Sequence, residues 1–515
     1  MIEVAKVEVG MIHDWAPEPG SFVSWQPSPA TLAKVRQAPI TAVPPSYTQA
    51  QHLRDYRAYA ARGLDMSRLV IATWSIPGRC DIRAMTYVVN AHLRRHDTYR
   101  SWFDETDREH IVHRTIAEAS DINLVPTKYG EITPAELRSH LLATPSPLQW
   151  DCFRFAIIQR ADHFTFCVCI DHLHTDAMFF SLAYTEIHVM YATVTRGGAP
   201  ISLPEAGSYH AYCVRQRRHT SALTLESAEV REWIEFFENN DGTLPDWPLP
   251  LGDPFVPCDV IGAQLLDKRQ TLEFESVCLS VGARFCGGAF ACAALAEYEL
   301  TGAETYYGVV PIDIRRTPAD FVTAGWFIGY VPMTVPVASS FGATARAAQA
   351  SFDSGRDLAD VPLDRVLELA PWLRKAEWGA PLMFYLEAGI PPLSAVANSQ
   401  LDGLNAGHYG DGRILLGRIN IRVIRLENET QLVVVFPKNP IASESVSRYV
   451  RAMKSVFTSV AEGRTAVAPP QSVADLRASL APHHLTQARE VATQMTKPSA
   501  SVTTAADLLE DRLHP

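Results

Sequence analysis

One stretch of this 515-residue chain, residues 163–194, constrains its fold more than any other. Within it, residues 164–170 (FTFCVCI) alternate large apolar side chains with smaller or more polar ones, a period of two that predicts a β-strand. Residues 178–194 (MFFSLAYTEIHVMYATV) carry apolar side chains at helical spacing. His172 lies between the predicted strand and helix, and Asp176 follows four residues later. A histidine fixed at such a junction can act as a general base, although from spacing alone a structural histidine is the commoner explanation.

Composition narrows the class of protein. Hydrophobic residues make up 47% of the chain and charged residues 20%, as in soluble globular proteins, and the length allows about three domains. The formal net charge is −11 and no basic block is present, which argues against nucleic acid as a partner and against a polybasic membrane anchor. No signal peptide and no apolar run of about 18–20 residues is evident, so we expect a cytoplasmic protein. The nine scattered cysteines form no zinc-binding spacing and are expected to be buried and free.

The periodicity predicts alternating helices and strands in both halves of the chain, and therefore a layered α/β architecture. In the first half we expect extended chain over 1–45, helices over 46–62 and 81–96, and strands over 69–76, 111–113, 153–159 and 164–170. In the second half we expect strands over 270–281, 305–312, 329–337, 419–426 and 431–436, and helices over 283–300 and 443–459. After residue 463 the composition shifts to Ala, Ser, Thr and Pro, which predicts a mobile tail over 464–515.

Six short segments, taken in order, resemble the motifs of the condensation-domain and chloramphenicol-acetyltransferase-like superfamily of acyltransferases. They are 45–51 (PSYTQAQ), 95–103 (RHDTYRSWF), 171–177 (DHLHTDA), 209–216 (YHAYCVRQ), 325–332 (GWFIGYVP) and 360–366 (DVPLDRV). The third stands where the superfamily has H-H-x-x-x-D-G. Within the superfamily the chain looks most like the polyketide-associated protein (Pap) acyltransferases of mycobacteria, in the branch that acylates trehalose. The segments that carry this finer likeness are 14–20 (DWAPEPG), 23–27 (VSWQP) and 91–96 (AHLRRH).

The resemblance implies two chloramphenicol-acetyltransferase-like lobes in a V-shaped pseudo-dimer, with the active histidine in a tunnel between them. We expect the first lobe over 1–215 and the second over 216–463. One mouth of the tunnel would admit the acyl thioester and the other the acceptor.

The resemblance also assigns roles to residues of the site. His172 would be the catalytic base, with His174 a candidate helper, and Asp176 would be structural, paired with an arginine of the other lobe. Arg315 and Arg316 are the candidates for that arginine, and the spacing to Gly325 favours Arg316. Two departures stand out: Asp171 replaces the first histidine of the motif, which we expect to be tolerated, and Ala177 replaces its glycine. Because alanine keeps the backbone N–H, we expect weakened rather than abolished oxyanion binding there.

The expected activity is an acyltransferase for groups other than aminoacyl groups, moving a long-chain or polyketide-derived acyl group from a thioester to trehalose or an acyltrehalose in cell-envelope glycolipid synthesis. The donor would be acyl-CoA or a carrier-bound acyl group, with no further cofactor and no metal. A lipid transporter and the inner face of the membrane are further candidate partners. Two alternatives stay open: a peptide-forming condensation enzyme, and a catalytically silent acyl- or carrier-binding module, which Ala177 favours. No G-x-S-x-G, P-loop or G-x-G-x-x-G motif is present, so a serine hydrolase or nucleotide enzyme is not indicated.

Overall fold

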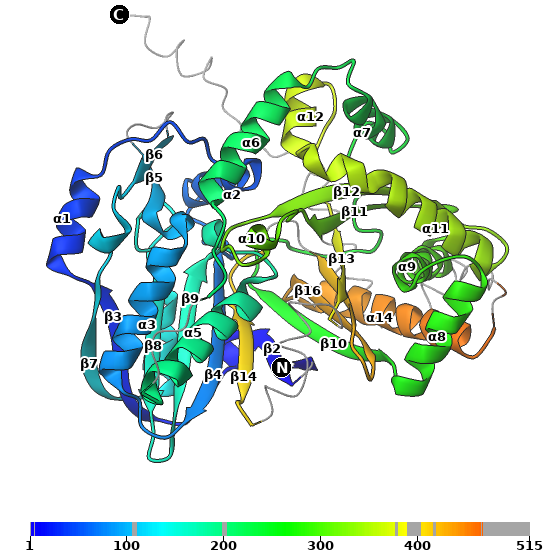
Figure 1. Ribbon diagram of the computed structural model, residues 1–515. Helices are drawn as coiled ribbons and strands as arrows, with labels where there is room; N and C mark the ends of the chain where they lie inside the picture. The colour runs from blue at the N-terminus through cyan, green and yellow to red at the C-terminus, as the bar shows by residue number, and fades with distance from the viewer. Residues whose placement is uncertain are drawn as a thin grey trace, which may run out of the picture.

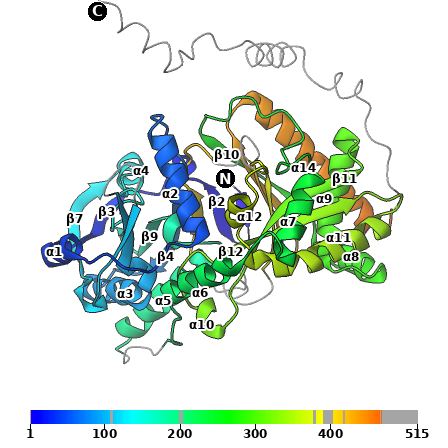
Figure 2. The same cartoon turned by 90° about the horizontal axis from the view of Figure 1, so that it is seen from above.

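The protein was analysed as a computed structural model, which describes residues 2–4, 6–105, 111–197, 203–375, 380–388, 403–415, 419–464 and 466. Its core is built on two β-sheets that lie side by side, each covered by its own helices (Figure 1). Figure 2 shows the same division from above, with α3 and α5 in one lobe and α8, α9, α11 and α14 in the other.

The first sheet has eight strands in the order β1-β2-β14-β4-β9-β8-β3-β7. Its strands are β1 (Ile2–Val4), β2 (Val7–Met11), β3 (Gly20–Pro27), β4 (Leu69–Pro77), β7 (Leu124–Ile132), β8 (Phe153–Gln159), β9 (His163–Asp171) and β14 (Ala406–Gly410). All come from the first third of the chain except β14, which lies between β2 and β4, parallel to the first and antiparallel to the second. The second half of the chain therefore completes the first sheet.

The alternation of β9 places its side chains on two faces of this sheet. Phe164, Phe166, Val168 and Ile170 pack with α3 (Ile82–Arg95) and α5 (Phe179–Thr195), whereas the cysteines between them pack with α4 (Pro134–Leu142). Both faces of the strand are buried, which explains why no charged residue interrupts the run. This core fixes the end of β9, and with it the position of His172.

The second sheet has six strands in the order β10-β16-β15-β13-β11-β12. They are β10 (Cys258–Leu266), β11 (Thr305–Asp313), β12 (Ile328–Pro336), β13 (Leu382–Glu387), β15 (Asn420–Arg425) and β16 (Thr430–Pro437). One face is covered by α8 (Lys268–Ser280), α9 (Phe285–Thr301), α11 (Phe341–Gly355) and α14 (Pro440–Ala461). Part of the opposite face packs against Val4 and Val9 of the first sheet, through Leu386, Ile424 and Val433. The two sheets thus meet directly.

Shorter elements join and flank the lobes. They are α1 (Pro29–Gln37), α2 (Tyr47–Ala60), β5 (Ser101–Glu105), β6 (Ile111–Thr115), α6 (Tyr209–Ala222), α7 (Ala228–Glu238), α10 (Pro318–Phe321) and α12 (Leu363–Leu369), with 3-10 turns at Ile12–Asp14, Asp97–Arg100, Ala119–Asp121, His172–His174 and Arg356–Asp360. Helix α6 runs across the top of the junction between the lobes in Figure 1.

The sequence-based elements are largely confirmed, with two corrections. Residues 270–281 form helix α8 and not a strand: Asp267 and Gln270 make a capping box, and Thr271, Phe274 and Cys278 bury one helical face. Residues 1–45 are not extended throughout, because Pro29–Gln37 is a helix whose N-terminus is capped by the Ser28 side chain. The hairpin of β8 and β9 closes through Arg160 and His163.

The domain limits at residues 215 and 463 stay a prediction, as does a tunnel between the lobes. The expected mobile tail lies almost entirely outside the described residues, which end at 464 and 466. The nine cysteines are all buried and free, as expected. Among the described helices, none by itself has the length and apolar character of a membrane span; α8 and α9 have them only in combination, with a 95° bend between them.

Candidate active site

His172 begins a 3-10 turn directly after β9. Its backbone N–H donates to the carbonyl of Arg68 at 2.7 Å, which ties the turn to the start of β4. Ring atom Nδ1 is enclosed without a hydrogen-bond partner, whereas Nε2 is not enclosed and has no partner in the described chain. Burial lowers the pKa of His172 to about 4, helped by the nearby His52 ring and opposed by its own carbonyl, Asp171 and Asp176. The ring is therefore neutral at pH 7, with Nε2 available as a proton acceptor.

Trp326 covers His172 from the second lobe. The centroids of the indole and the imidazole are 4.2 Å apart, with 42° between the ring planes. The same indole lies edge-on to the ring of His52, on helix α2, at 5.6 Å. Trp326 thus restricts the motion of the imidazole and keeps water from one of its faces.

The segment that carries Trp326 is held on both sides. Ala324 N–H donates to Nδ1 of His96 at 3.2 Å, and Tyr209 Oη donates to the Trp326 carbonyl at 3.2 Å. Gly325 packs its bare Cα against the Tyr209 ring, where a Cβ would lie 2.3 Å from a ring carbon. These contacts come from His96, directly after α3, and from Tyr209 at the start of α6, so the position of the indole depends on both lobes.

Asp176 is structural in its contacts. Its Oδ2 accepts from Arg315 Nη1 and from Phe327 N–H, both at 2.9 Å, and its Oδ1 accepts from Met178 N–H at 3.0 Å. Both charged side chains of the ion pair are 1% exposed. With its lone pairs so occupied, Asp176 joins the two lobes and makes no hydrogen bond to His172.

The expectation that Arg316 would pair with Asp176 was wrong. Arg315 occupies that position, and its guanidinium also donates to the carbonyls of Asp320 and Thr323 and to the Asp313 carboxylate. Arg316 is 70% exposed and pairs with Asp360. Adjacent residues after a strand point to opposite sides, and only Arg315 points inward.

Ala177 and His174 occupy different environments. Ala177 is exposed, between Asp176 and the start of α5, and its backbone N–H has no partner in the part of the chain that the structure describes. His174 is buried and directed away from His172: its Nδ1 shares a hydrogen bond with Thr98 Oγ1 at 2.8 Å, and burial lowers its pKa to about 4. No contact between His174 and His172 is present among the described residues, so the structure does not support a helper role for His174.

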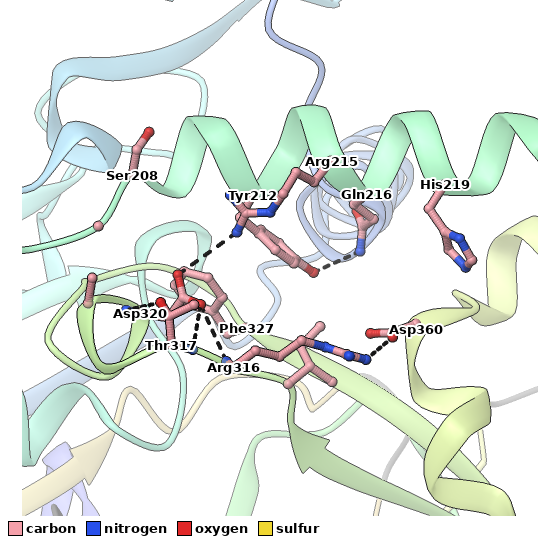
Figure 3. A pocket seen from close by; sticks show the side chains of 13 residues that line it. Ser208, Tyr212, Arg215, Gln216, His219, Arg316, Thr317, Asp320, Phe327 and Asp360 are labelled. Atoms are coloured by element: carbon pink, nitrogen blue, oxygen red, sulfur yellow. Dashed lines mark hydrogen bonds and ion pairs between the residues drawn. The ribbon is translucent and has the colours of Figure 1, made fainter.

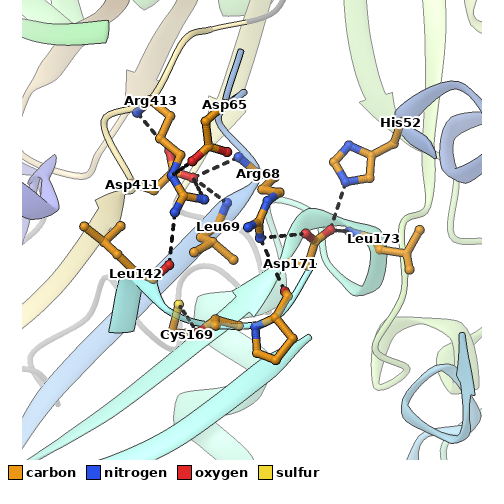
Figure 4. Close-up of polar contacts among 12 residues, drawn as sticks. His52, Asp65, Arg68, Leu69, Leu142, Cys169, Asp171, Leu173, Asp411 and Arg413 are labelled. Carbon is orange, nitrogen blue, oxygen red and sulfur yellow. Dashed lines mark hydrogen bonds and ion pairs between the residues drawn. The ribbon is translucent and has the colours of Figure 1, made fainter. Parts of the chain in front are cut away.

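Asp171 is part of a buried cluster at the end of β9 (Figure 4). Its Oδ1 lies 2.8 Å from Nε2 of His52 and accepts from Leu173 N–H at 3.0 Å, while Arg68 Nη1 is 3.5 Å from Oδ2. Burial opposes ionisation of Asp171, but His52 and Arg68 hold its pKa below the usual value. Asp411, just after β14, accepts from the backbone N–H groups of Arg68 and Leu69 at 3.0 Å each. The substitution of this motif position is therefore accommodated by a hydrogen bond with His52 of α2 and by the nearby Arg68, which the sequence did not reveal.

A second buried network lies behind the Trp326 segment. Oε2 of Glu186 on α5 lies 2.8 Å from Nδ1 of His92 and 3.0 Å from Nε2 of His96, and Arg95 Nε donates to Oε1 at 2.7 Å. His92, His96 and Glu186 could surround a metal ion. However, His96 Nδ1 accepts from Ala324 N–H, so its Nε2 carries the proton that binds Glu186. The donor atoms are occupied by hydrogen bonds, and the network fits a support for the Trp326 segment better than a metal site.

A cavity of about 550 Å³ opens to the surface between α6 and α10 (Figure 3). Phe327 lines it, while the neighbouring Trp326 contacts His172 and is not among the lining residues. Its two arginines are neutralised, since Arg316 pairs with Asp360 and Arg215 lies 3.9 Å from Asp320. The cavity therefore offers no unpaired charge of its own.

Comparison with known proteins identifies the family to which this chain belongs. Residues 69–378 match the family model of the condensation domain. Two curated relatives are "Acyltransferase PapA3" of Mycobacterium tuberculosis (strain CDC 1551 / Oshkosh), 52% identical over 90% of this chain and 98% of its own, and "Trehalose-2-sulfate acyltransferase PapA2" of Mycobacterium bovis (strain BCG / Pasteur 1173P2), 55% identical over 89% and 98%. The chain belongs to the Pap acyltransferases of the condensation-domain family.

A solved structure of the Pap family agrees. The structure named "PapA2 acyl transferase" superposes with a TM-score of 0.85 and 55% sequence identity, over 88% of this chain and all of that one. The two-lobe α/β fold expected from the sequence is confirmed, and so is the assignment to the Pap acyltransferases. Sequence reasoning named His172, Asp176 and Arg315, but not the surrounding His52, His96 and Trp326, although His96 and Trp326 lie inside two of the motifs that carried the resemblance.

Proposed function

We propose that this Pap acyltransferase moves an acyl group from a thioester to a hydroxyl of trehalose or of a sulfated or acylated trehalose, with His172 as the general base. The observation that carries the proposal is the neutral His172 ring, whose Nε2 is open while Trp326 covers one ring face. The name of the PapA2 relative, a trehalose-2-sulfate acyltransferase, supports the acceptor class.

The chemistry follows from the position of Nε2. It removes the proton of the acceptor hydroxyl while that oxygen attacks the thioester carbon, giving a tetrahedral oxyanion and an imidazolium. Collapse of the oxyanion breaks the C–S bond, and the imidazolium returns the proton to the leaving thiolate. A positioned base of this kind contributes roughly 10²–10⁴-fold.

Two features support the charged intermediate. The carbonyl of His172, Asp171 and Asp176 favour the protonated ring, which offsets part of the burial that lowers its pKa. The backbone N–H of Ala177, which has no partner among the described residues, would supply a donor for the oxyanion, in the role that the superfamily glycine would have. Asp176 takes no proton in this scheme and keeps the lobes in register through Arg315.

The donor, in this proposal, is acyl-CoA or a carrier-bound long-chain or polyketide-derived acyl group. The apolar product would pass to a lipid transporter or to the inner face of the membrane.

The test is acyl transfer by the purified protein, with trehalose and trehalose-2-sulfate as acceptors, a series of acyl-CoA donors, and products identified by mass spectrometry. We expect His172→Ala to lose at least about 10²-fold in rate. His163→Ala is the matched control, because His163 is at the other end of β9 and its ring bonds, among the described residues, to Asp162 alone. A His172→Ala variant with the wild-type rate would overturn the mechanism. Tight acyl-CoA binding without turnover on any sugar would favour the silent module.

A further inference from the structure

Arg422 lies between the two sheets, and no residue that the structure describes forms an ion pair with it. On strand β15, Ile421 and Val423 pack with the helices that cover the second sheet, whereas Ile424 packs toward Val4 and Val9 of the first sheet. The alternation of the strand puts the Arg422 side chain on the same face as Ile424. Its guanidinium lies 5.6 Å from the ring of Phe384, its cross-strand neighbour.

No hydrogen bond or ion pair holds the Arg422 guanidinium within the described residues. Desolvation by burial lowers its pKa, and the side chain is only partly exposed. The contrast with Arg425 on the same strand is direct, because Arg425 pairs with Glu275 at 2.6 Å and Glu387 at 3.2 Å. A guanidinium taken from bulk water without a partner is costly, so its presence needs a compensating ligand.

His408 faces the same space from the first sheet. Strand β14 places it beside Ala72 and Val9, on the face of α5, with its ring 6.3 Å from Phe180. It too has no hydrogen-bond partner among the described residues. Burial lowers its pKa to about 4, and the charge of Arg422, like that of His172 when protonated, acts in the same direction. Val9, the register neighbour of His408, packs with Ile424 on the Arg422 face of β15, so Arg422 and His408 share one environment.

Among the described residues, the groups whose charges act on His408 are Arg422 and the protonated form of His172, and none is a carboxylate. We propose that Arg422, assisted by His408, forms an oxyanion subsite between the sheets next to His172, which binds a sulfate or phosphate group of a substrate. The subsite rests on the proposed function, and it gives that function a specificity element.

Two substrates could supply the oxyanion: a sulfate ester on the trehalose acceptor, or a phosphate of the coenzyme A donor. The planar guanidinium suits either, since both present paired oxygens to its N–H groups. The experiment therefore measures binding of each substrate alone by calorimetry, with no turnover required. The acceptor pair is trehalose-2-sulfate and trehalose; the donor pair is acyl-CoA and the phosphate-free acyl-pantetheine.

We expect Arg422→Met to weaken binding of one charged substrate about 10–100-fold, while its uncharged counterpart binds as to the wild type. Loss for trehalose-2-sulfate alone identifies the acceptor sulfate, and loss for acyl-CoA alone identifies the donor phosphate. Arg422→Lys should recover part of the affinity. The control Arg425→Met removes the same kind of side chain from the same strand. It should leave the affinity difference within the acceptor pair and within the donor pair unchanged.

Stability provides an independent readout. Since no described residue forms a hydrogen bond or ion pair with Arg422, Arg422→Met should unfold at the wild-type temperature or above it. Arg425→Met, which removes the ion-pair partner of Glu275 and Glu387, should unfold lower. The subsite is overturned if Arg422→Met binds all four compounds as the wild type does. That result would leave acyl transfer by His172 untouched, and a failure of His172 chemistry would equally leave these binding measurements valid.

Discussion

Trp326 Cα belongs to the second lobe, yet its indole lies over the imidazole of His172 with the ring centroids 4.2 Å apart. The proposed general base is therefore covered by a side chain that lies just before β12, a strand of the other sheet. Trp326→Ala should reduce kcat/KM about 10–100-fold, because the imidazole gains freedom and water reaches its covered face. Trp326→Phe should recover most of the rate.

The pH profile separates positioning from a loss of fold. If Trp326 contributes to the desolvation of His172, the apparent pKa of the base in Trp326→Ala should rise from about 4 toward the ordinary histidine value. An unchanged profile with a lower rate would contradict this role.

The Asp176–Arg315 pair should dominate the stability of the junction. Arg315→Met leaves a carboxylate uncompensated at 1% exposure, so we expect about 3–5 kcal/mol of lost stability in urea unfolding. Arg316→Met is the matched control, since an ion pair with a 70% exposed arginine is worth only about 0–1 kcal/mol. Equal losses for the two variants would contradict the assignment of Arg315.

The low pKa of His172 sets the acid limit of activity. A base whose pKa lies near 4 stays unprotonated as the pH falls from 7, so protonation of His172 should not reduce kcat/KM until the pH comes within about one unit of that value. Rates measured from pH 4 to 8 with saturating donor test this. An inflection of kcat/KM near pH 6.5 that is lost in the His172→Ala variant would contradict it.

The Asp171–His52 pair should stabilise the fold in a pH-dependent way. Burial opposes the charge, but His52 and Arg68 depress the Asp171 pKa below 3.8, so the stabilisation is fully present above that value and is lost as the pH falls through the folded-state pKa. Asp171→Asn should therefore cost about 1–3 kcal/mol at pH 7, and this difference from the wild type should shrink in acid. The double variant His52→Gln/Asp171→Asn should lose less stability than the sum of the two single losses, since both substitutions remove the same contact.

Periodicity predicted the elements whose packing is regular. Strand β9 was recognised because both of its faces are buried and its alternation is unbroken. Helix α8 was mistaken for a strand because Leu272 and Leu279 are 54% and 62% exposed, so apolar residues lie on both faces and hide the helical stripe. The sequence does not show which apolar residues of a segment are exposed in the folded protein.

The site shows a similar limit. A motif located His172 and Asp176, but the choice between Arg315 and Arg316 depends on which side of a strand end faces inward. His52 is distant in sequence from His172, as Arg422 is from His408, and each pair is brought together only by packing of the fold. A single sequence carries no signal for such contacts.

A central strand of the first sheet, β14, is synthesised long after its two neighbours. During translation, β2 and β4 emerge long before Ala406–Gly410, the strand that fills the place between them. Until then β4 presents an open edge, which favours pairing with other chains. A nascent chain would be vulnerable to aggregation through most of its elongation, and the first lobe produced by itself should need chaperones or a supplied β14 peptide to remain folded.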